Sequence, residues 1–453
     1  QTVTFPLLNN QAGRIISSRS GKNPAIGEFM VIDVEMAGGD IRSFAAELED
    51  HKLNIPPIVG LENTNEPDEI LKSFQGTLET ILETGLADNP DLVRIADRWF
   101  PKALLVDVNI GHLNLVEALL EMENGGPLPT KKIIDQIELP TDVNLRLTEF
   151  SLNHALQNDG RFDEVGPSGE VLWFLRRLEP PEVRETPIYL RKSSYPEYDA
   201  AYNETHLSLF DEHIIDELQP ELMGRLKDGA VVIALTYPHW RSGTLPISGY
   251  LTNLFPSAYE SPRVLFTFFD TENNDRFSGW VVRQSKYVFG LHEWYKLHDI
   301  IPGSLIALEK SEKSGEILIK IQKRRSSKEY VKTALVGADG GIVFANLKQM
   351  VSCEFDERLA LVTPDVDSID AIWQSSAKQR GTIEKSILAM MRELAKLTPQ
   401  GHVHAQELYS AVNLVRRCPP GPILSLLLEN DQVSDLGNLY FRLEDKAKGD
   451  END

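Results

Sequence analysis

The stretch YPHWRSGTLP, residues Tyr237–Pro246, decides how the middle of the chain is interpreted. It follows an apolar run, Ala230–Thr236, whose length and β-branched residues predict a buried strand. Two aromatic rings, a histidine, an arginine, a glycine and two prolines then follow within ten residues. Such a stretch suits either a reactive pocket or the polar rim of a barrel. The sequence favours the rim, because no base–nucleophile pair held by a third group is present.

The segment 228–335 around this stretch is predicted to be a small β-barrel or sandwich. Gly, Asn, Asp and Pro separate its strand-like runs at the intervals expected of such a fold. One helix is expected near His292–His298. The strands are expected at AVVIALT, RVLFTFFD, SGWVVRQ, KYVFGL, SLIALE and EILIKIQ.

Residues 112–178 and 378–444 share one order of elements, three short helices followed by a hairpin, which is the pattern of a winged helix. In the first copy Thr130 is expected to be a helix N-cap, and Gly166–Gly169 form the hairpin turn. In the second copy Gly437 and Asn438 occupy the turn. The expected helices are Leu113–Glu123, TKKIIDQIE and Leu147–Asp159 in the first copy, and TIEKSILAMMRELAKL, QGHVHAQELYSAVN and CPPGPILSLLLEN in the second.

The remaining segments are less regular. Residues 1–111 contain one expected strand, Phe29–Met36, and helical spacing over Ile41–His51 and Asp68–Gly85. Residues 179–227 are predicted to be an acidic connector with an amphipathic helix over SLFDEHIIDELQPELMGRL. Residues 336–377 are expected to be a β extension and linker, and 445–453 a disordered acidic tail.

The segment 228–335 resembles the DNA-binding pseudobarrel of plant auxin-response-type transcription factors, which restriction endonuclease effector domains share. The resemblance rests on LTYPHWRSGTLPIS, VLFTFFD, GWVV and GLHEWYKLHDIIPGSLIAL. Two departures are Ser304 where the family has Asp, and a short stretch between Trp280 and Gly290. The resemblance implies two DNA-facing arms on the barrel.

Residues 112–178 resemble the winged helix of the delta subunit of bacterial RNA polymerase, also found beside some restriction endonucleases. The residues that carry this likeness are GGPLPTKKIID and DGRFDEVG followed by LWFL. The resemblance implies a bacterial role in transcription or DNA-linked systems, with RNA polymerase or other proteins as partners. The sequence thus predicts a multidomain α+β protein: two winged-helix modules flanking a small β pseudobarrel, with an α/β N-terminal region of unknown fold.

Charge and composition restrict the function. The net charge is −22, which argues against nucleic-acid binding by the chain as a whole. However, 228–335 carries +3 and 378–444 carries +1, whereas 112–178 carries −5, which favours a protein-binding role for that copy. No apolar run reaches about 18 residues, and no signal peptide is expected. Two cysteines form no disulfide framework, so a cytoplasmic location is expected.

The predicted DNA contacts are side chains with hydroxyl, guanidinium, ammonium or ring donors. They lie in four groups along the chain. They are the first arm (His239, Trp240, Arg241, Ser242, Thr244), the second arm (Arg283, Gln284, Ser285, Lys286), an expected charged tip between two strands (Lys323, Arg324, Arg325, Lys328), and a pair before a helix of the C-terminal module (Arg416, Arg417). For each group, a purely structural role remains the alternative.

The first hypothesis is therefore a non-enzymatic nucleic-acid-binding protein of transcription regulation or of restriction-modification-type genome defence. A protein–protein scaffold is the second hypothesis. A metal-dependent nuclease is the third, based on Asp33 with Asp50, His51 and Lys52. No small-molecule cofactor and no membrane partner is expected. A metal site is not expected either, since His402 and His404 lack further ligands at suitable spacing.

Overall fold

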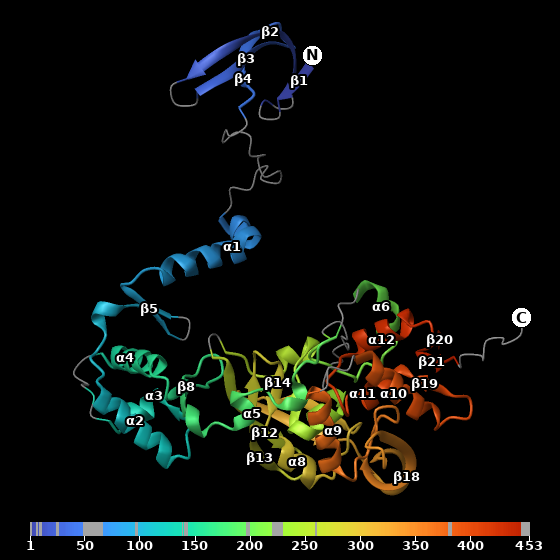
Figure 1. Cartoon of the computed structure of the whole chain (residues 1–453). Coiled ribbons are helices and arrows are strands. Elements are labelled where there is room, and N and C mark those ends of the chain that lie inside the picture. The colour runs from blue at the N-terminus through green and yellow to red at the C-terminus, as the bar shows by residue number, and fades with distance from the viewer. Residues whose placement is uncertain are drawn as a thin grey trace, which may run out of the picture. The chain divides into compact units, whose positions relative to one another are not determined.

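The computed structural model describes residues 2–5, 8, 11–23, 27–48, 67–95, 98–137, 139, 144–195, 200–219, 230–258, 261–378 and 383–444. The fold is mixed α+β, and the chain divides into two compact units, Gln1–Asp88 and Asn89–Asp453 (Figure 1). Among the described residues, no helix combines the length and apolar character that crossing a membrane requires.

The first unit contains an antiparallel sheet of four strands in sequential order and one long helix. The predicted strand and the second predicted helix are confirmed, as β3 and α1. The helix predicted over Ile41–His51 is wrong for Ile41–Ala46, which pairs along β3 from Glu35 to Met30 as strand β4, and residues 49–51 lie outside the described residues. The elements are β1 Thr2–Phe5, β2 Gln11–Asn23, β3 Gly27–Met36, β4 Ile41–Ala46 and α1 Pro67–Ala87.

The second unit begins with a helical module. Its core holds Val116, Leu120, Leu152 and Trp173. Thr130 was wrongly predicted to be an N-cap: it lies inside α3, and its hydroxyl instead donates to Asn153. The elements are β5 Leu92–Ile95, β6 Arg98–Pro101, η3 Lys102–Leu104, α2 Ile110–Met122, β7 Leu128–Pro129, α3 Thr130–Ile134, α4 Leu145–Asn158, β8 Phe162–Glu164, β9 Leu172–Leu175 and η4 Arg176–Leu178.

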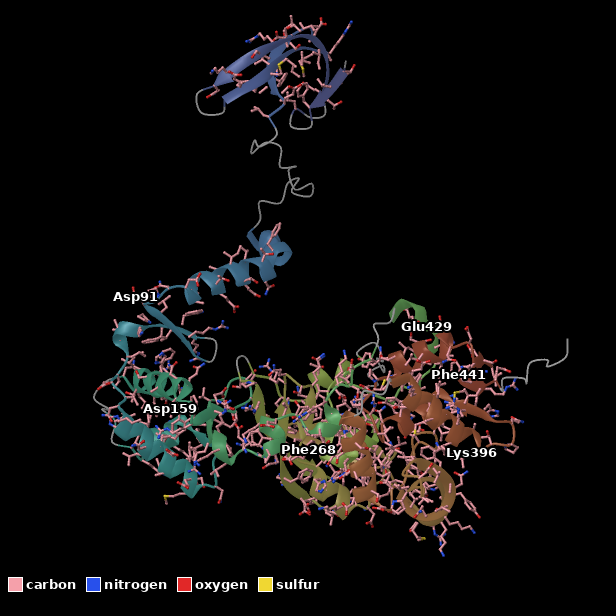
Figure 2. The ribbon with its side chains drawn as sticks, in the orientation of Figure 1. Asp91, Asp159, Phe268, Lys396, Glu429 and Phe441 are labelled. Atoms are coloured by element: carbon pink, nitrogen blue, oxygen red, sulfur yellow. The ribbon has the colours of Figure 1, made fainter. Side chains whose placement is uncertain are left out.

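The predicted barrel segment forms one curled seven-stranded sheet, in the order β10-β15-β16-β12-β13-β14-β11. All neighbours are antiparallel except β12 and β16. Phe268 is completely buried in its core (Figure 2). The elements are β10 Val231–Ala234, α7 Tyr237–Ser242, β11 Thr244–Pro246, η6 Gly249–Asn253, β12 Arg263–Asp270, β13 Asp275–Val282, β14 Tyr287–Phe289, α8 His292–Leu297, β15 Leu305–Lys310 and β16 Glu316–Ile321.

The C-terminal part combines a long hairpin with a second helical module. The strand order β19-β21-β20 repeats the order β7-β9-β8 of the first module. Helix α9 was not expected in the predicted β extension. The elements are β17 Lys323–Val336, β18 Ile342–Cys353, α9 Val366–Lys378, α10 Ile383–Ala395, β19 His402–His404, α11 Ala405–Val412, α12 Pro420–Glu429, β20 Val433–Asp435 and β21 Tyr440–Leu443.

The connector between the first module and the barrel differs from its prediction. Its helices are α5 Pro181–Arg184, η5 Ile188–Leu190 and α6 Ala200–Leu207. The prediction of an amphipathic helix is wrong over 208–219, where the chain makes turns. The rest of the predicted helix, from residue 220 on, lies outside the described residues. The cause is tertiary: Asp216, Glu217 and Gln219, which a surface helix would expose, are buried against the C-terminal module.

Candidate nucleic-acid interface

The first arm is a short helix and strand packed inside the second unit. His239 and Thr244 are both buried, and their side chains hydrogen-bond at 2.9 Å. The other ring nitrogen of His239 lies 2.9 Å from a carboxylate oxygen of Glu217. The indole of Trp240 donates to the carbonyl of Ile300 at 2.7 Å. These side chains hold the barrel together and do not form a solvent-facing arm.

The arginine of this arm is also engaged. Arg241 makes two hydrogen bonds to the carboxylate of Asp370 on α9, the shorter at 2.6 Å. Its guanidinium lies over the ring of Tyr189, 5.4 Å from the centroid. Ser242 is buried. The structure therefore assigns the first arm the alternative role, pairing and packing, that the sequence left open.

Arg417 is the centre of a buried ionic network. Its guanidinium bonds both oxygens of Asp216, at 2.6 and 2.9 Å, and one oxygen of Glu217 at 2.9 Å. It is 1% exposed, so it offers no surface to a phosphate. Burial alone raises the pKa of Glu217, but the charges of Arg417 and His239 outweigh it and leave that pKa well below its ordinary value. Arg416, the other member of the predicted pair, is half-buried and also has interactions.

The second arm is the turn between β13 and β14. Arg283, Gln284 and Lys286 are exposed, and Ser285 is half-buried. Arg283 donates to the carbonyl of Ser261 at 2.9 Å. The hydroxyl of Ser285 lies 2.8 Å from that of Thr186. The exposed part of the second arm thus carries two cations, and the connector supports it from one side.

Lys323, Arg324, Arg325 and Lys328 do not form the predicted tip between two strands. They begin the long strand β17, which pairs with β18, and the turn of this hairpin lies beyond Val336. The pairing shifts register between Lys323 and Ser327. A bulge of this kind re-aims side chains away from the regular ladder, and all four cations are exposed.

Two of these cations are partly neutralised. Lys323 pairs with Glu272 at 2.9 Å, and Arg324 pairs with Glu329 at 2.8 Å. Arg325 and Lys328 make no ion pair within the described part of the chain. The sequence-based prediction therefore holds for exposure and fails for the local structure.

Sequence reasoning missed the partner strand. Lys348 on β18 is exposed and lies opposite Tyr330, which is 68% exposed. Together β17 and β18 carry six cationic residues and one acid, Glu329. Lys348 and Met350 are two residues apart and therefore share one face of a strand, but only pairing with β17 joins the two cationic segments. We call Lys323, Arg324, Arg325, Lys328 and Lys348 the ribbon cations.

The second arm and Lys323, the first of the ribbon cations, lie at opposite ends of the β12–β13 hairpin. The second arm adjoins the paired residues Arg263 and Val282, while Glu272, the partner of Lys323, lies in the turn beyond Asp270 and Asp275. Eight residues of strand at about 3.3 Å each separate these ends by roughly 25 Å. The exposed cations of the second arm and the ribbon thus form two separate surface groups. The ribbon carries more of them than the second arm does.

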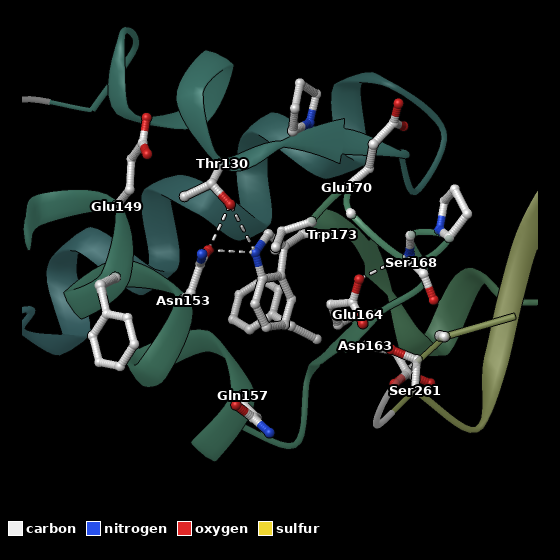
Figure 3. Close-up of a pocket in the computed structure, with 18 of the residues that line it drawn as sticks. Thr130, Glu149, Asn153, Gln157, Asp163, Glu164, Ser168, Glu170, Trp173 and Ser261 are labelled. Atoms are coloured by element: carbon white, nitrogen blue, oxygen red, sulfur yellow. Dashed lines mark hydrogen bonds between the residues drawn. The ribbon is translucent and has the colours of Figure 1, made fainter. Parts of the chain in front are cut away.

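A cleft of about 850 Å³ lies between the first helical module and the barrel (Figure 3). At its floor the Trp173 indole donates to Asn153 at 2.9 Å and to Thr130 at 3.2 Å. Its rim mixes cations with carboxylates, including Lys131, Arg146, Glu149 and Glu170. Ser261 also lines the cleft, and its buried hydroxyl has no hydrogen-bond partner among the residues that the structure describes. This lining suits a mixed polar and apolar ligand better than a polyanion.

Within the described ranges, two clusters each bring three potential metal ligands together, and hydrogen bonds within each cluster explain its geometry. His213 lies 2.6 Å from Asp356, with Asp211 nearby. In the second, formed by Asp270, Glu272 and His298, the Asp270 carboxylate accepts from the Trp294 indole at 3.0 Å and lies 2.8 Å from His298. We assign a metal to neither cluster. His404, considered as a ligand above, caps α11 by accepting from the Gln406 amide.

The remaining reactive candidates are structural or lie outside the described residues. Asp33 accepts hydrogen bonds from Ser17 at 2.6 Å and from Ser43 at 2.5 Å, which lower its pKa. Asp50, His51 and Lys52, its predicted nuclease partners, lie outside the described residues. Burial raises the pKa of the Cys418 thiol to about 12, so it is not a thiolate at neutral pH.

No protein-family model, curated protein or solved structure matches the chain.

Proposed function

We propose that this protein binds nucleic acid without acting as an enzyme, and that the ribbon cations are its principal phosphate contacts. The observation that carries the proposal is the concentration of exposed positive charge on β17 and β18 in a chain of net charge −22. Phosphate binding needs such a local basic footprint rather than a basic protein. A role in transcription or genome defence remains part of this proposal.

We further propose that the curled sheet is a pseudobarrel and that the two helical modules are winged helices. The recurrence of three helices and a three-stranded sheet in one strand order supports the second assignment. In this arrangement the barrel supports the ribbon, since Val331 and Val351 on the ribbon pack into the barrel core.

The salt dependence of binding tests the proposal. Three ribbon cations, Arg325, Lys328 and Lys348, make no ion pair among the described residues. Neutralising about three phosphates gives a slope of log K against log salt of about −2.1 for a single strand and about −2.7 for a duplex. The affinity of the full chain for a fluorescent 20-nucleotide oligonucleotide, single- or double-stranded, should therefore fall about 20- to 40-fold between 50 and 200 mM salt.

Charge-reversal variants locate the contact. The pair Arg325→Glu and Lys328→Glu should abolish binding at 50 mM salt. Lys385→Glu, an exposed cation on α10, is the matched control and should change affinity less than threefold. No binding by the wild type at low salt, or equal loss in variant and control, would refute the ribbon as the phosphate contact.

Binding of a protein partner at the 850 Å³ cleft is the second candidate function. The cleft has the volume of a ligand site, and its mixed lining suits a peptide segment. Gln157→Trp would fill it from α4, whereas Lys132→Trp lies on α3 outside it. Peptides selected from a random library on the wild type should lose affinity for the first variant only. Equal binding to both variants would exclude the cleft.

A further inference from the structure

The outer face of the ribbon alternates cations with exposed apolar side chains. Lys328 lies opposite Met350, and Tyr330 lies opposite Lys348. Tyr330 is 68% exposed and Met350 is 63% exposed. Because side chains two residues apart share a face of a strand, these four form one patch with cations on one diagonal and apolar groups on the other. We call these four residues the ribbon patch.

The tyrosine of the ribbon patch is held in place and remains accessible. The Lys348 ammonium lies over its ring, 5.2 Å from the centroid. Farther along the same face, Lys332 is buried and donates to Glu407 and to the Arg358 carbonyl. The patch is therefore anchored at one end by the C-terminal module, while its ring and thioether face solvent. Large exposed apolar side chains grouped in this way indicate a binding surface.

The chemistry of the patch favours unpaired bases over a duplex. An exposed ring stacks on the face of a base, and only an unpaired base offers its whole face. Reading a duplex through its major groove uses arginine, lysine, asparagine or glutamine against base edges, and of these the ribbon patch has only its two lysines, with no guanidinium fork and no side-chain amide. Its lysines can neutralise the phosphates of a strand whose base lies on Tyr330.

We propose that the ribbon patch is a stacking site for single-stranded nucleic acid, with Tyr330 as the base platform and Lys328 and Lys348 as phosphate contacts. This inference rests on the proposed function, because it specifies which nucleic acid the ribbon binds. The chain then prefers a single strand to the matching duplex, and Tyr330 accounts for much of that preference.

Fluorescence anisotropy on the full chain tests this with three labelled probes: a mixed-sequence 20-nucleotide DNA strand, the corresponding RNA strand and the matching 20-base-pair DNA duplex. Tyr330→Ala should weaken single-strand binding about tenfold, and Tyr330→Phe should restore it to within threefold. Leu347→Ala, an exposed apolar truncation on the other face of the ribbon, is the matched control and should change affinity less than twofold. Circular dichroism should show the same fold in all three variants.

The outcomes separate this inference from the proposed function. If Tyr330→Ala leaves single-strand affinity unchanged, or the duplex binds more tightly than either strand, the stacking site is refuted. In that case a loss of binding in the Arg325→Glu and Lys328→Glu variant still supports the ribbon as a phosphate contact. If the wild type binds no probe at 50 mM salt, both proposals fall.

Discussion

Truncating Arg417 to alanine tests the buried network that joins the connector to the C-terminal module. Arg417 makes three charge-assisted hydrogen bonds to Asp216 and Glu217 and a fourth hydrogen bond, at 3.1 Å, to Asn413. Removing one partner of a buried ion pair leaves the other charge uncompensated and costs about 3–5 kcal/mol. His239 and Tyr409 still contact the two carboxylates, which places the expected loss within that range rather than above it.

Urea denaturation of the full chain at pH 7, followed by tryptophan fluorescence, measures this loss in the free energy of unfolding. The neighbouring Arg416→Ala is the matched control and should cost less than about 1 kcal/mol, because Arg416 is only half-buried. The triple variant Asp216→Asn, Glu217→Gln, Arg417→Met removes every charge of the ion pair and should cost less than Arg417→Ala alone. A cost below 1 kcal/mol for Arg417→Ala, or a triple variant less stable than the single one, would refute the reasoning.

The loss of stability in Arg417→Ala depends on pH in a predictable direction. In the wild type the pKa of Glu217 lies below its ordinary value, so its contribution to stability is present above about pH 4 and is lost as pH falls through the folded-state pKa. Without Arg417, burial dominates and raises that pKa. With a raised pKa in the folded state, protonation of Glu217 favours folding as the pH falls. The loss in the free energy of unfolding of Arg417→Ala relative to the wild type should therefore shrink between pH 7 and about pH 4. A deficit that grows on acidification would contradict this.

Two further predictions concern local conformation. Burial is the main cause that lowers the pKa of His404 to about 4, so its protonation opposes folding between about pH 6.5 and 4. His404→Asn keeps an N-cap acceptor, and in urea denaturation it should remove about 3 kcal/mol of the unfolding free energy that the wild type loses over that pH range. An unchanged pH profile in this variant would exclude His404 as the cause. Gly243 has φ +65°, and a Cβ there would meet the Cβ of His292 at 2.7 Å, so Gly243→Ala should lower the stability measured by thermal denaturation by about 2–4 kcal/mol. The control Gly315→Ala has φ +71° but open space around it, and it should lower the stability by only about 1–2 kcal/mol. Equal losses in the two variants would show that the contact at Gly243 is not tight.

Sequence periodicity determined the elements whose formation is local. The helices α1, α2, α4 and α10, the hairpin β8–β9 and most barrel strands follow from the spacing of their own apolar residues and turns. The repeated order of elements in the two helical modules was also visible in the sequence, because each module carries its own pattern. The prediction failed where pairing with another strand decided the conformation, as in β4, which pairs with the preceding strand β3, and in the first residues of β17, which pair with the end of β18.

Tertiary structure alone decided which charged residues face solvent. Arg241, Arg417 and Lys328 look equally available in the sequence, yet Asp370 on α9 holds the first and Asp216 in the connector buries the second. Only Lys328 remains exposed, and β18 brings Lys348 onto its face from 20 residues farther along the chain. Composition therefore established that cations are present, whereas long-range pairing determined which are buried and which are available to bind. The physical reason is that a buried charge requires a partner, and the fold supplies that partner from segments far apart in sequence.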